Sequence, residues 1–261
     1  MTVLWAALLL LGLGLLCGLM LVAASRLFGV PKNELEEALR EALPGVNCGA
    51  CGYVGCDAYA AALAKREAPV GRCTPGGEET LEKTATLLGV DGALVKQVAV
   101  VRCVGCDQKA PKKTTFDGTK SCKTAMLLHG GDKACAFGCL GYGDCVAVCE
   151  YGALALENGI AKVDTTLCRG CAMCASVCPK DLIAMAKPEK AVVLCQSPQK
   201  AKEKRVACTA GCIACGKCAK ACPLGAVTVQ NGCAVVSEAL CDGCGACAEV
   251  CPTACITRIT E

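Results

Sequence analysis

The chain has 261 residues, of which 28 are cysteine and only eight are aromatic (one Trp, four Tyr and three Phe), and its formal net charge is +3. So few large side chains exclude an ordinary hydrophobic core over this length, so disulfides, metal ions or clusters must cross-link the fold. This net charge counts each cysteine as neutral. Bound four-thiolate clusters carry negative charge and would make the protein acidic. The net charge therefore does not support a nucleic-acid role.

An uncharged, leucine-rich run opens the chain at residues 3–24. These 22 residues can cross a hydrocarbon layer of about 30 Å as a helix, so we predict a transmembrane anchor over residues 1–25. A signal peptide fits less well, because no basic residue precedes the run. Basic residues follow it, which predicts a single-pass protein of the cell membrane with the bulk of the chain on the cytoplasmic side: Arg26, Lys32 and Arg40.

Residues 26–90 are predicted to form a small helical domain around four cysteines. Asn33 and Glu36 match a capping box, which starts a helix that Pro44 and Gly45 end. The spacing of the cysteines resembles the four-cysteine [4Fe–4S] domain of a few anaerobic electron-transfer and corrinoid proteins, with a zinc knuckle as the alternative. These cysteines are Cys48, Cys51, Cys56 and Cys73.

Residues 91–134 are predicted to be a connecting segment that contains one strand, at 99–102. The segment offers three thiols to a further cluster but no evident fourth ligand, so no role is assigned to them: Cys103, Cys106 and Cys122. His129, the only histidine, is predicted to be an ordinary loop or helix-end residue.

Three runs of closely spaced cysteines follow, each ending in Cys-Pro. The clearest run has two, two and three residues between its thiols, at Cys168, Cys171, Cys174 and Cys178. This is the bacterial ferredoxin run, in which three cysteines hold one [4Fe–4S] cluster and the fourth binds a second. Thiols this close rarely pair as disulfides, and zinc sites usually join two separated CxxC pairs. The runs therefore predict iron–sulfur clusters.

From residue 135 onward the sequence repeats at an offset of 73 residues. Eight cysteines of the first copy have a counterpart in the second, which indicates a duplicated module. Each copy has an Asn-Gly pair between apolar alternations, at 158–159 and 231–232, which predicts a β-hairpin. We therefore predict two two-cluster ferredoxin modules, module 1 over 135–187 and module 2 over 208–261, with a linker over 188–207.

The first copy lacks one thiol of the standard run, because Tyr142 aligns with Cys215. Cys135 is therefore predicted to serve as the third ligand in module 1. Its counterpart Cys208 competes with Cys215 in module 2, and we predict Cys215 because the 212/215/218 spacing is standard. Cys233 and Cys255 align with apolar residues and are predicted to be small core residues, and Cys195 has no assigned role.

Together these patterns predict an α+β protein with five [4Fe–4S] clusters, or six if residues 103–122 bind another. No catalytic residue is expected. The predicted cluster ligands are Cys48, Cys51, Cys56, Cys73, Cys135, Cys139, Cys145, Cys149, Cys168, Cys171, Cys174, Cys178, Cys212, Cys215, Cys218, Cys222, Cys241, Cys244, Cys247 and Cys251.

Two lysine-rich segments, 109–133 and 187–205, each carry six basic and two acidic residues. Solvated surface is the first interpretation. The more specific hypothesis is a docking face for an acidic soluble ferredoxin, which complementary charge would steer toward the chain.

The order of these parts resembles the B subunit of the Rnf electron-transport complex, in its long, cluster-rich form. The resemblance rests on the N-terminal anchor, the Asn-Cys-Gly-Ala-Cys-Gly-Tyr-Val-Gly-Cys stretch at 47–56, the stretch at 138–145 and the ferredoxin modules. It implies an electron-transfer subunit of a ferredoxin:NAD oxidoreductase complex that moves Na⁺ or H⁺. Ferredoxin would be its electron donor, and other membrane subunits would be its partners.

Rival interpretations come from other classes of protein. A polyferredoxin subunit of a hydrogenase or quinone reductase would share the same cluster runs. A corrinoid-linked methyl-transfer protein is suggested only by the four-cysteine domain, and a structural zinc protein would be colourless and redox-silent. We find no GxGxxG placed between a strand and a helix, no P-loop and no Ser–His–Asp order, so the chain is not expected to bind NAD or flavin by those routes.

Overall fold

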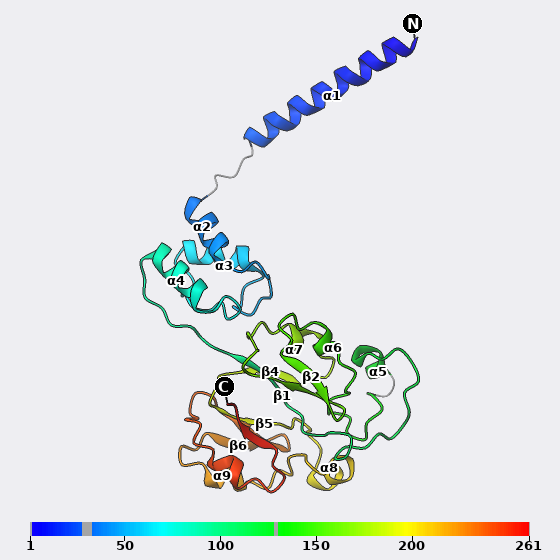
Figure 1. The fold of residues 1–261 in the computed structure, drawn as a ribbon, viewed down its shortest axis with the longest axis vertical. Helices are drawn as coiled ribbons and strands as arrows, with labels where there is room; N and C mark the ends of the chain where they lie inside the picture. The colour runs from blue at the N-terminus through cyan, green and yellow to red at the C-terminus, as the bar shows by residue number, and fades with distance from the viewer. Residues whose placement is uncertain (1, 28–32, 128–129, 261) are drawn as a thin grey trace.

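The structure is a computed structural model that describes residues 2–27, 33–127 and 130–260. Figure 1 shows a long N-terminal helix, a group of three helices next to it, and a larger body in which short strands and helices alternate. Two residues singled out in the sequence, His129 and Lys32, lie outside the described residues.

Helix α1 (Thr2–Leu27) stands apart from the rest of the chain (Figure 1). Its large apolar side chains, where described, are exposed, from Trp5 at 67% to Val22 at 55%. Counting only residues that the structure describes, no helix is both long and apolar enough to cross a membrane. The anchor over residues 1–25 stays a prediction.

Three helices form the small domain that follows: α2 (Glu34–Ala42), α3 (Cys56–Ala64) and α4 (Gly77–Leu88). The predicted helix start is confirmed, since the side chain of Asn33 accepts a hydrogen bond from the Leu35 amide (3.2 Å). The core of this domain contains Leu39, Tyr59 and Leu63, which are at most 2% exposed.

Module 1 contains two antiparallel strand pairs, with no hydrogen bonds recorded between the pairs in the described residues. One pair joins β1 (Val98–Val101) to β4 (Ile183–Ala186), and the other joins β2 (Leu154–Glu157) to β3 (Ile160–Val163). Three short helices accompany them: α5 (Cys122–Leu127), α6 (Asp144–Ala147) and α7 (Met173–Val177).

Module 2 repeats this arrangement. β5 (Ala191–Val193) pairs with β8 (Ile256–Arg258), and β6 (Val227–Gln230) pairs with β7 (Cys233–Val236). Its helices are α8 (Ala201–Ala207), α9 (Lys217–Ala221) and α10 (Ala246–Glu249).

Both predicted Asn-Gly hairpins are confirmed. Asn158 and Gly159 have φ angles of 48° and 77°, and Asn231 and Gly232 have 46° and 73°. Two consecutive positive φ angles are the signature of the tight turn that matches the twist of the flanking strands. Asn and Gly tolerate this conformation, which is why the turns can be read from the sequence.

Each module begins earlier in the chain than its first ferredoxin-type cysteine. The strand predicted at 99–102 is confirmed as β1, whose four side chains are all buried, and it pairs with the last strand of module 1. β5 lies in the segment predicted as a linker and pairs in the same way in module 2. Ile259 of module 2 packs with Val98 and Val100 of β1, so the modules share an apolar boundary.

Candidate metal centres

All 28 cysteines lie in the described residues and are free thiols. Disulfides therefore do not cross-link this fold. In the described part of the chain, no group of three or more His, Cys, Asp or Glu side chains is placed so that it could hold a single metal ion. The thiols instead gather in sets that surround loops and cavities.

The first set lies in the helical domain and contains Cys48, Cys51, Cys56 and Cys73. Burial raises the pKa of the Cys73 thiol, and the other three thiols add to the shift because they lie close by, which brings the pKa to about 11. The side chain of Asn47 accepts a hydrogen bond from the Cys56 amide (2.8 Å) and so ties the two ends of the loop together. Gly55 has a φ of 151°, and a Cβ there would lie 3.0 Å from this Asn47 oxygen, so this position favours glycine.

The second set joins the end of α6 to the loop before α7. Burial raises the pKa of the Cys174 thiol, and the nearby thiols of Cys168, Cys171 and Cys149 add to the shift, which brings the pKa to about 11. The Cys168 sulfur also accepts a hydrogen bond from the Ala99 amide of β1 (3.4 Å). These four thiols are the predicted ligands from two different parts of the repeat.

The third set surrounds a cavity in module 1 that has an empty volume of about 370 Å³. Its thiols are Cys122, Cys139, Cys145 and Cys178. Cys122 stands here in place of Cys135, which the structure positions around a different cavity.

Asp144 explains why Cys122 reaches this cavity. Its carboxylate accepts hydrogen bonds from the Cys122 amide (3.0 Å), the Lys123 amide (3.0 Å) and the Ser121 hydroxyl (2.9 Å). Burial opposes ionisation of this carboxyl, but the three hydrogen bonds outweigh it and lower its pKa. The first turn of α5 is thereby fixed beside α6, which carries Cys145.

At position 142, where module 2 has the thiol of Cys215, module 1 has a packed tyrosine. Tyr142 donates a hydrogen bond to Asp132 (2.8 Å), and its ring meets that of Phe116 edge-on with centroids 5.5 Å apart. Asp132 also pairs with Lys112 (2.9 Å) and is 3% exposed. Position 142 therefore belongs to a packed polar network in module 1.

The fourth set surrounds a cavity in module 2 with an empty volume of about 310 Å³: Cys212, Cys215, Cys218 and Cys251. Cys255 also lines this cavity, whereas Cys208 lies elsewhere. The Cys212 sulfur accepts a hydrogen bond from the Ala234 amide (3.4 Å).

The fifth set follows α9. Burial raises the pKa of the Cys247 thiol, and Cys241 and Cys222 are among the neighbouring thiols that raise it further. Cys244 lies in the same loop as Cys241 and is exposed. The structure thus brings three of these four predicted ligands together and leaves the fourth at the surface.

Cys233 and Cys255 do more than fill the core. Both are buried, as predicted, at 5% and 1% exposure. The neighbouring Cys233 and Cys255 thiols lower the pKa of Cys212. Cys233 also lowers the pKa of Cys195 to about 6 by the same means. The repeat hides this role, because the aligned residues of module 1 are apolar.

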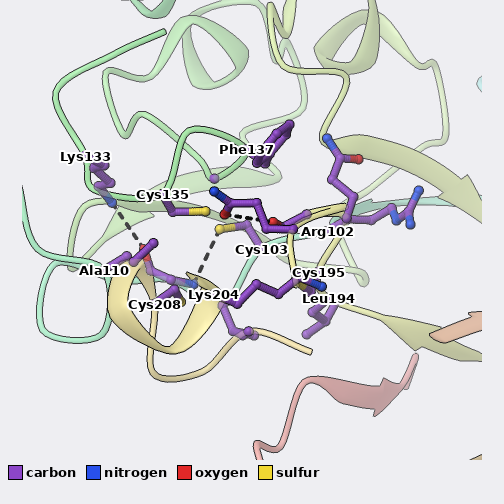
Figure 2. A pocket seen from close by; sticks show the side chains of 18 residues that line it. Arg102, Cys103, Ala110, Lys133, Cys135, Phe137, Leu194, Cys195, Lys204 and Cys208 are labelled. Carbon is purple, nitrogen blue, oxygen red and sulfur yellow. Dashed lines mark hydrogen bonds between the residues drawn. The ribbon is translucent and has the colours of Figure 1, made fainter. Parts of the chain in front are cut away.

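A further cavity lies between the modules, and Figure 2 shows it from close by. Its four thiols come from four separate segments of the chain: Cys103, Cys135, Cys195 and Cys208. Cys106, in the same loop as Cys103, is not among the residues that line it. We call this cavity the seam cavity.

These sets fit [4Fe–4S] clusters. Thiolate is the soft ligand that holds iron–sulfur clusters, and the thiols surround cavities instead of meeting at a point. Backbone amides donate hydrogen bonds to ligand sulfurs, as at Cys168 and Cys212. The buried thiols whose pKa is raised must lose protons when a cluster binds, so loading is coupled to proton release.

Comparison with protein families supports the same chemistry. A model described as "Putative Fe-S cluster" matches residues 43–75. A "4Fe-4S dicluster domain" matches residues 167–226, and a "4Fe-4S binding domain" matches residues 234–257.

Curated relatives resemble most of the chain. The B subunit of an ion-translocating oxidoreductase complex of Methanosarcina acetivorans is 40% identical over 230 residues, which cover 87% of each chain. The B subunit of the Na⁺-translocating ferredoxin:NAD⁺ oxidoreductase complex of Acetobacterium woodii is 40% identical over 85% of this chain and 68% of its own. The B subunit of the proton-translocating ferredoxin:NAD⁺ oxidoreductase complex of Clostridium ljungdahlii is 39% identical over 87% of this chain and 82% of its own.

Proposed function

Because this chain belongs to the family of B subunits of ion-translocating oxidoreductase complexes, we propose that it relays electrons from reduced ferredoxin to the membrane subunits of such a complex. It is the iron–sulfur electron-transfer subunit of an ion-translocating ferredoxin:NAD oxidoreductase. The relatives are named for Na⁺ and for protons.

One observation carries the relay: neighbouring thiol sets adjoin each other along the molecule. Cys48 of the helical domain lies close enough to Cys171 of module 1 to raise its pKa, in addition to the effect of burial. Cys145 and Cys174, from the two sets of module 1, interact in the same way. In module 2, Cys218 of one set likewise affects the pKa of Cys247 of the other.

We assign the cluster ligands from these sets. A bound [4Fe–4S] cluster accepts and releases one electron, and the chain's residues set its potential through burial, hydrogen bonds to sulfur and local charge. The ligands in the helical domain are Cys48, Cys51, Cys56 and Cys73. Those of module 1 are Cys122, Cys139, Cys145 and Cys178, with Cys149, Cys168, Cys171 and Cys174. Those of module 2 are Cys212, Cys215, Cys218 and Cys251, with Cys222, Cys241, Cys244 and Cys247.

Residues 3–24 anchor the protein to the membrane in this proposal. The run has no charged residue, and its described apolar side chains are exposed on an isolated α1. An apolar environment would bury them at a gain of about 25 cal/mol per Å². Arg26 and Arg40 after the run favour the cytoplasmic side for the cluster domains.

Exposed lysines are the docking face for ferredoxin. Lys109, Lys113 and Lys123 are exposed, and Lys123 directly follows Cys122 in the chain. Lys133 and Lys204, also in the lysine-rich segments, are 2% exposed and cannot contact a partner, which corrects the surface interpretation for these two residues.

The proposal is tested by purifying the full chain anaerobically and measuring iron, acid-labile sulfide and zinc. The five sets above predict at least about twenty iron atoms per chain with matching sulfide. Zinc in place of iron would overturn the electron-transfer role. Co-purification with flavin-bearing membrane proteins supports the complex, whereas a nickel protein would point to a hydrogenase.

Docking is tested by changing Lys109, Lys113 and Lys123 to Gln. Reduction by ferredoxin should slow at low salt, and the difference should shrink at high salt because screening removes the steering. Changing Lys217 and Lys220, which are exposed on α9, to Gln is the matched control. Equal rates for both variants would reject this docking face.

A further inference from the structure

We propose that Cys103, Cys135, Cys195 and Cys208 hold an additional [4Fe–4S] cluster in the seam cavity, which carries electrons between the two modules. That the bound group is a [4Fe–4S] cluster rests on the proposed function. These four ligands do not form a ferredoxin-type run of closely spaced cysteines. Cys103 and Cys195 each lie in a loop after a strand, and Cys135 and Cys208 each lie just before a cysteine run.

The seam cavity is at least as large as the module cavities. Its empty volume is about 460 Å³, against 370 and 310 Å³ for the two cavities that the ferredoxin-type sets surround. Figure 2 shows the four cysteines around it, with Arg102 and Lys204 also at its wall. Each of the three cavities is therefore surrounded by at least four thiols.

The four thiols form two equivalent pairs. Cys103 and Cys195 each lie two residues after the first strand of a module, β1 or β5. The Cys103 sulfur accepts hydrogen bonds from the Gly105 amide (3.4 Å) and the Cys139 amide (3.3 Å).

The backbone groups of Ser197 and Cys212 lie close to the Cys195 sulfur in the matching positions. Cys139 and Cys212 are partners in the 73-residue repeat, as are Cys135 and Cys208. Each module thus contributes the same half-site, which explains why Cys135 and Cys208 recur although neither lines a ferredoxin-type cavity.

Small residues let the loops approach the sulfurs. A Cβ on Gly105 would lie 3.3 Å from the Cys208 sulfur and 3.6 Å from that of Cys103. A Cβ on Gly138 would lie 3.5 Å from Cys135 and 3.6 Å from Cys103, and one on Gly211 would lie 3.7 Å from Cys195. Thiols of both modules therefore adjoin the same stretch of wall.

The charge around the cavity calls for an anionic group. Arg102, Lys133 and Lys204 line it, and the lining contains no Asp or Glu in the described residues. Lys133 pairs with Asp107 (3.2 Å), which lies outside the lining, so Lys204 is the cation that needs a partner. Lys204 is 2% exposed, and its ammonium contacts the Cys212 carbonyl (3.0 Å), the Gly232 carbonyl (2.5 Å) and the Cys233 sulfur (3.3 Å). No carboxylate among the described residues pairs with it. A buried cation needs nearby negative charge, and a four-thiolate cluster, at about −2, supplies it.

The site lies where a relay between modules needs one. Cys103 contacts the amide of Cys139, a ligand of module 1, and Cys195 contacts that of Cys212, a ligand of module 2. The seam cluster would accept one electron from the module 1 cluster, which is oxidised by one electron. It would then pass that electron to the module 2 cluster, which is reduced by one electron, and the reverse direction is equally balanced. No other reactant is required.

The test is iron and sulfide analysis of full-length variants purified anaerobically. The parent should hold about twenty-four iron atoms, and Cys103→Ser, Cys135→Ser, Cys195→Ser and Cys208→Ser should each hold about twenty. The double variant Cys103→Ser with Cys195→Ser should lose no more iron than either single variant, because all four thiols serve one cluster. Cys106→Ser, in the same loop, is the matched control and should keep the iron of the parent.

A parent with about twenty iron atoms and single variants without loss would overturn the seam cluster and leave the proposed function standing. Losses that add in the double variant would also overturn it, since they indicate general misfolding. A parent with zinc instead of iron would reject the proposed function itself.

Discussion

Exchanging the thiol of Cys122 for one at position 142 tests how module 1 completes its ligand set. Cys122 lines the same cavity as Cys139, Cys145 and Cys178, so Cys122→Ser should cost one cluster, about four iron atoms per chain. Cys122→Ala combined with Tyr142→Cys should restore them, because position 142 aligns with Cys215 and returns the run to the standard spacing.

The exchange restores the cluster but not the whole stability of the module. Replacing Tyr142 removes an aromatic ring packed against Phe116 and a hydrogen bond to Asp132. Loss of a large packed ring costs about 3 kcal/mol of unfolding free energy, so the exchanged chain should denature more readily than the parent. Tyr142→Phe keeps the ring and should keep all the iron, at a cost of about 1.5–3 kcal/mol for the lost hydrogen bond to the charged Asp132 carboxylate, which keeps its pairing with Lys112.

Iron and sulfide analysis after anaerobic purification separates the two possible third ligands. If Cys122 and Cys135 serve different clusters, Cys122→Ser with Cys135→Ser should lose about eight iron atoms. Full iron content in Cys122→Ser would refute the reasoning, because Cys122 would then be a spare thiol and Cys135 the ligand of module 1.

Three further predictions concern single side chains. Asp132→Asn should destabilise module 1 by about 1–3 kcal/mol at neutral pH and cancel the acid sensitivity of this site. Burial raises the pKa of Asp132, but hydrogen bonds from Lys112 and Tyr142 lower it overall. The stabilising effect of this carboxylate is therefore present above the unfolded pKa of about 4 and disappears as the pH falls. Equal acid-unfolding curves for the parent and the variant would contradict this. Cys233→Ile removes the thiol that donates to the Cys195 sulfur (3.9 Å) and should lower a cluster potential in a redox titration, whereas Cys255→Leu should act on the module 2 cluster through Cys212 and Cys251. Asn158→Val and Asn231→Val should each cost about 1–2 kcal/mol in thermal unfolding, because both positions have positive φ; no loss would place the turns in another conformation.

Local patterns in the sequence predict much of this fold. The helix start at Asn33 follows from a side chain and an amide two residues apart, and both hairpins follow from adjacent Asn and Gly residues. The ferredoxin runs likewise place three thiols within one loop. In each of these cases the cause lies within a few residues of its effect.

Long-range contacts account for what the sequence analysis misses. Cys122 lies 17 residues before Cys139, and it reaches the cavity only because Asp144 binds the start of α5. Cys103 and Cys195 are separated from their cavity partners by whole strands and helices, so no spacing rule links them. The missing thiol at position 142 is the one available signal that another cysteine must come from elsewhere in the chain.

Duplication explains the arrangement of thiols at the seam. A single module carries one cysteine after its first strand and one before its cysteine run, which is half of what a cubane requires. Two modules that meet with these half-sites facing each other supply four thiols, and each also places a buried lysine at the wall: Lys133, which pairs with Asp107 (3.2 Å), and Lys204. Each lysine also bonds the carbonyl of the glycine in its module's Asn-Gly turn, Gly159 (2.6 Å) or Gly232 (2.5 Å). The residues that position the seam are therefore repeated along with the modules, so a site absent from either copy alone arises when the two pack together.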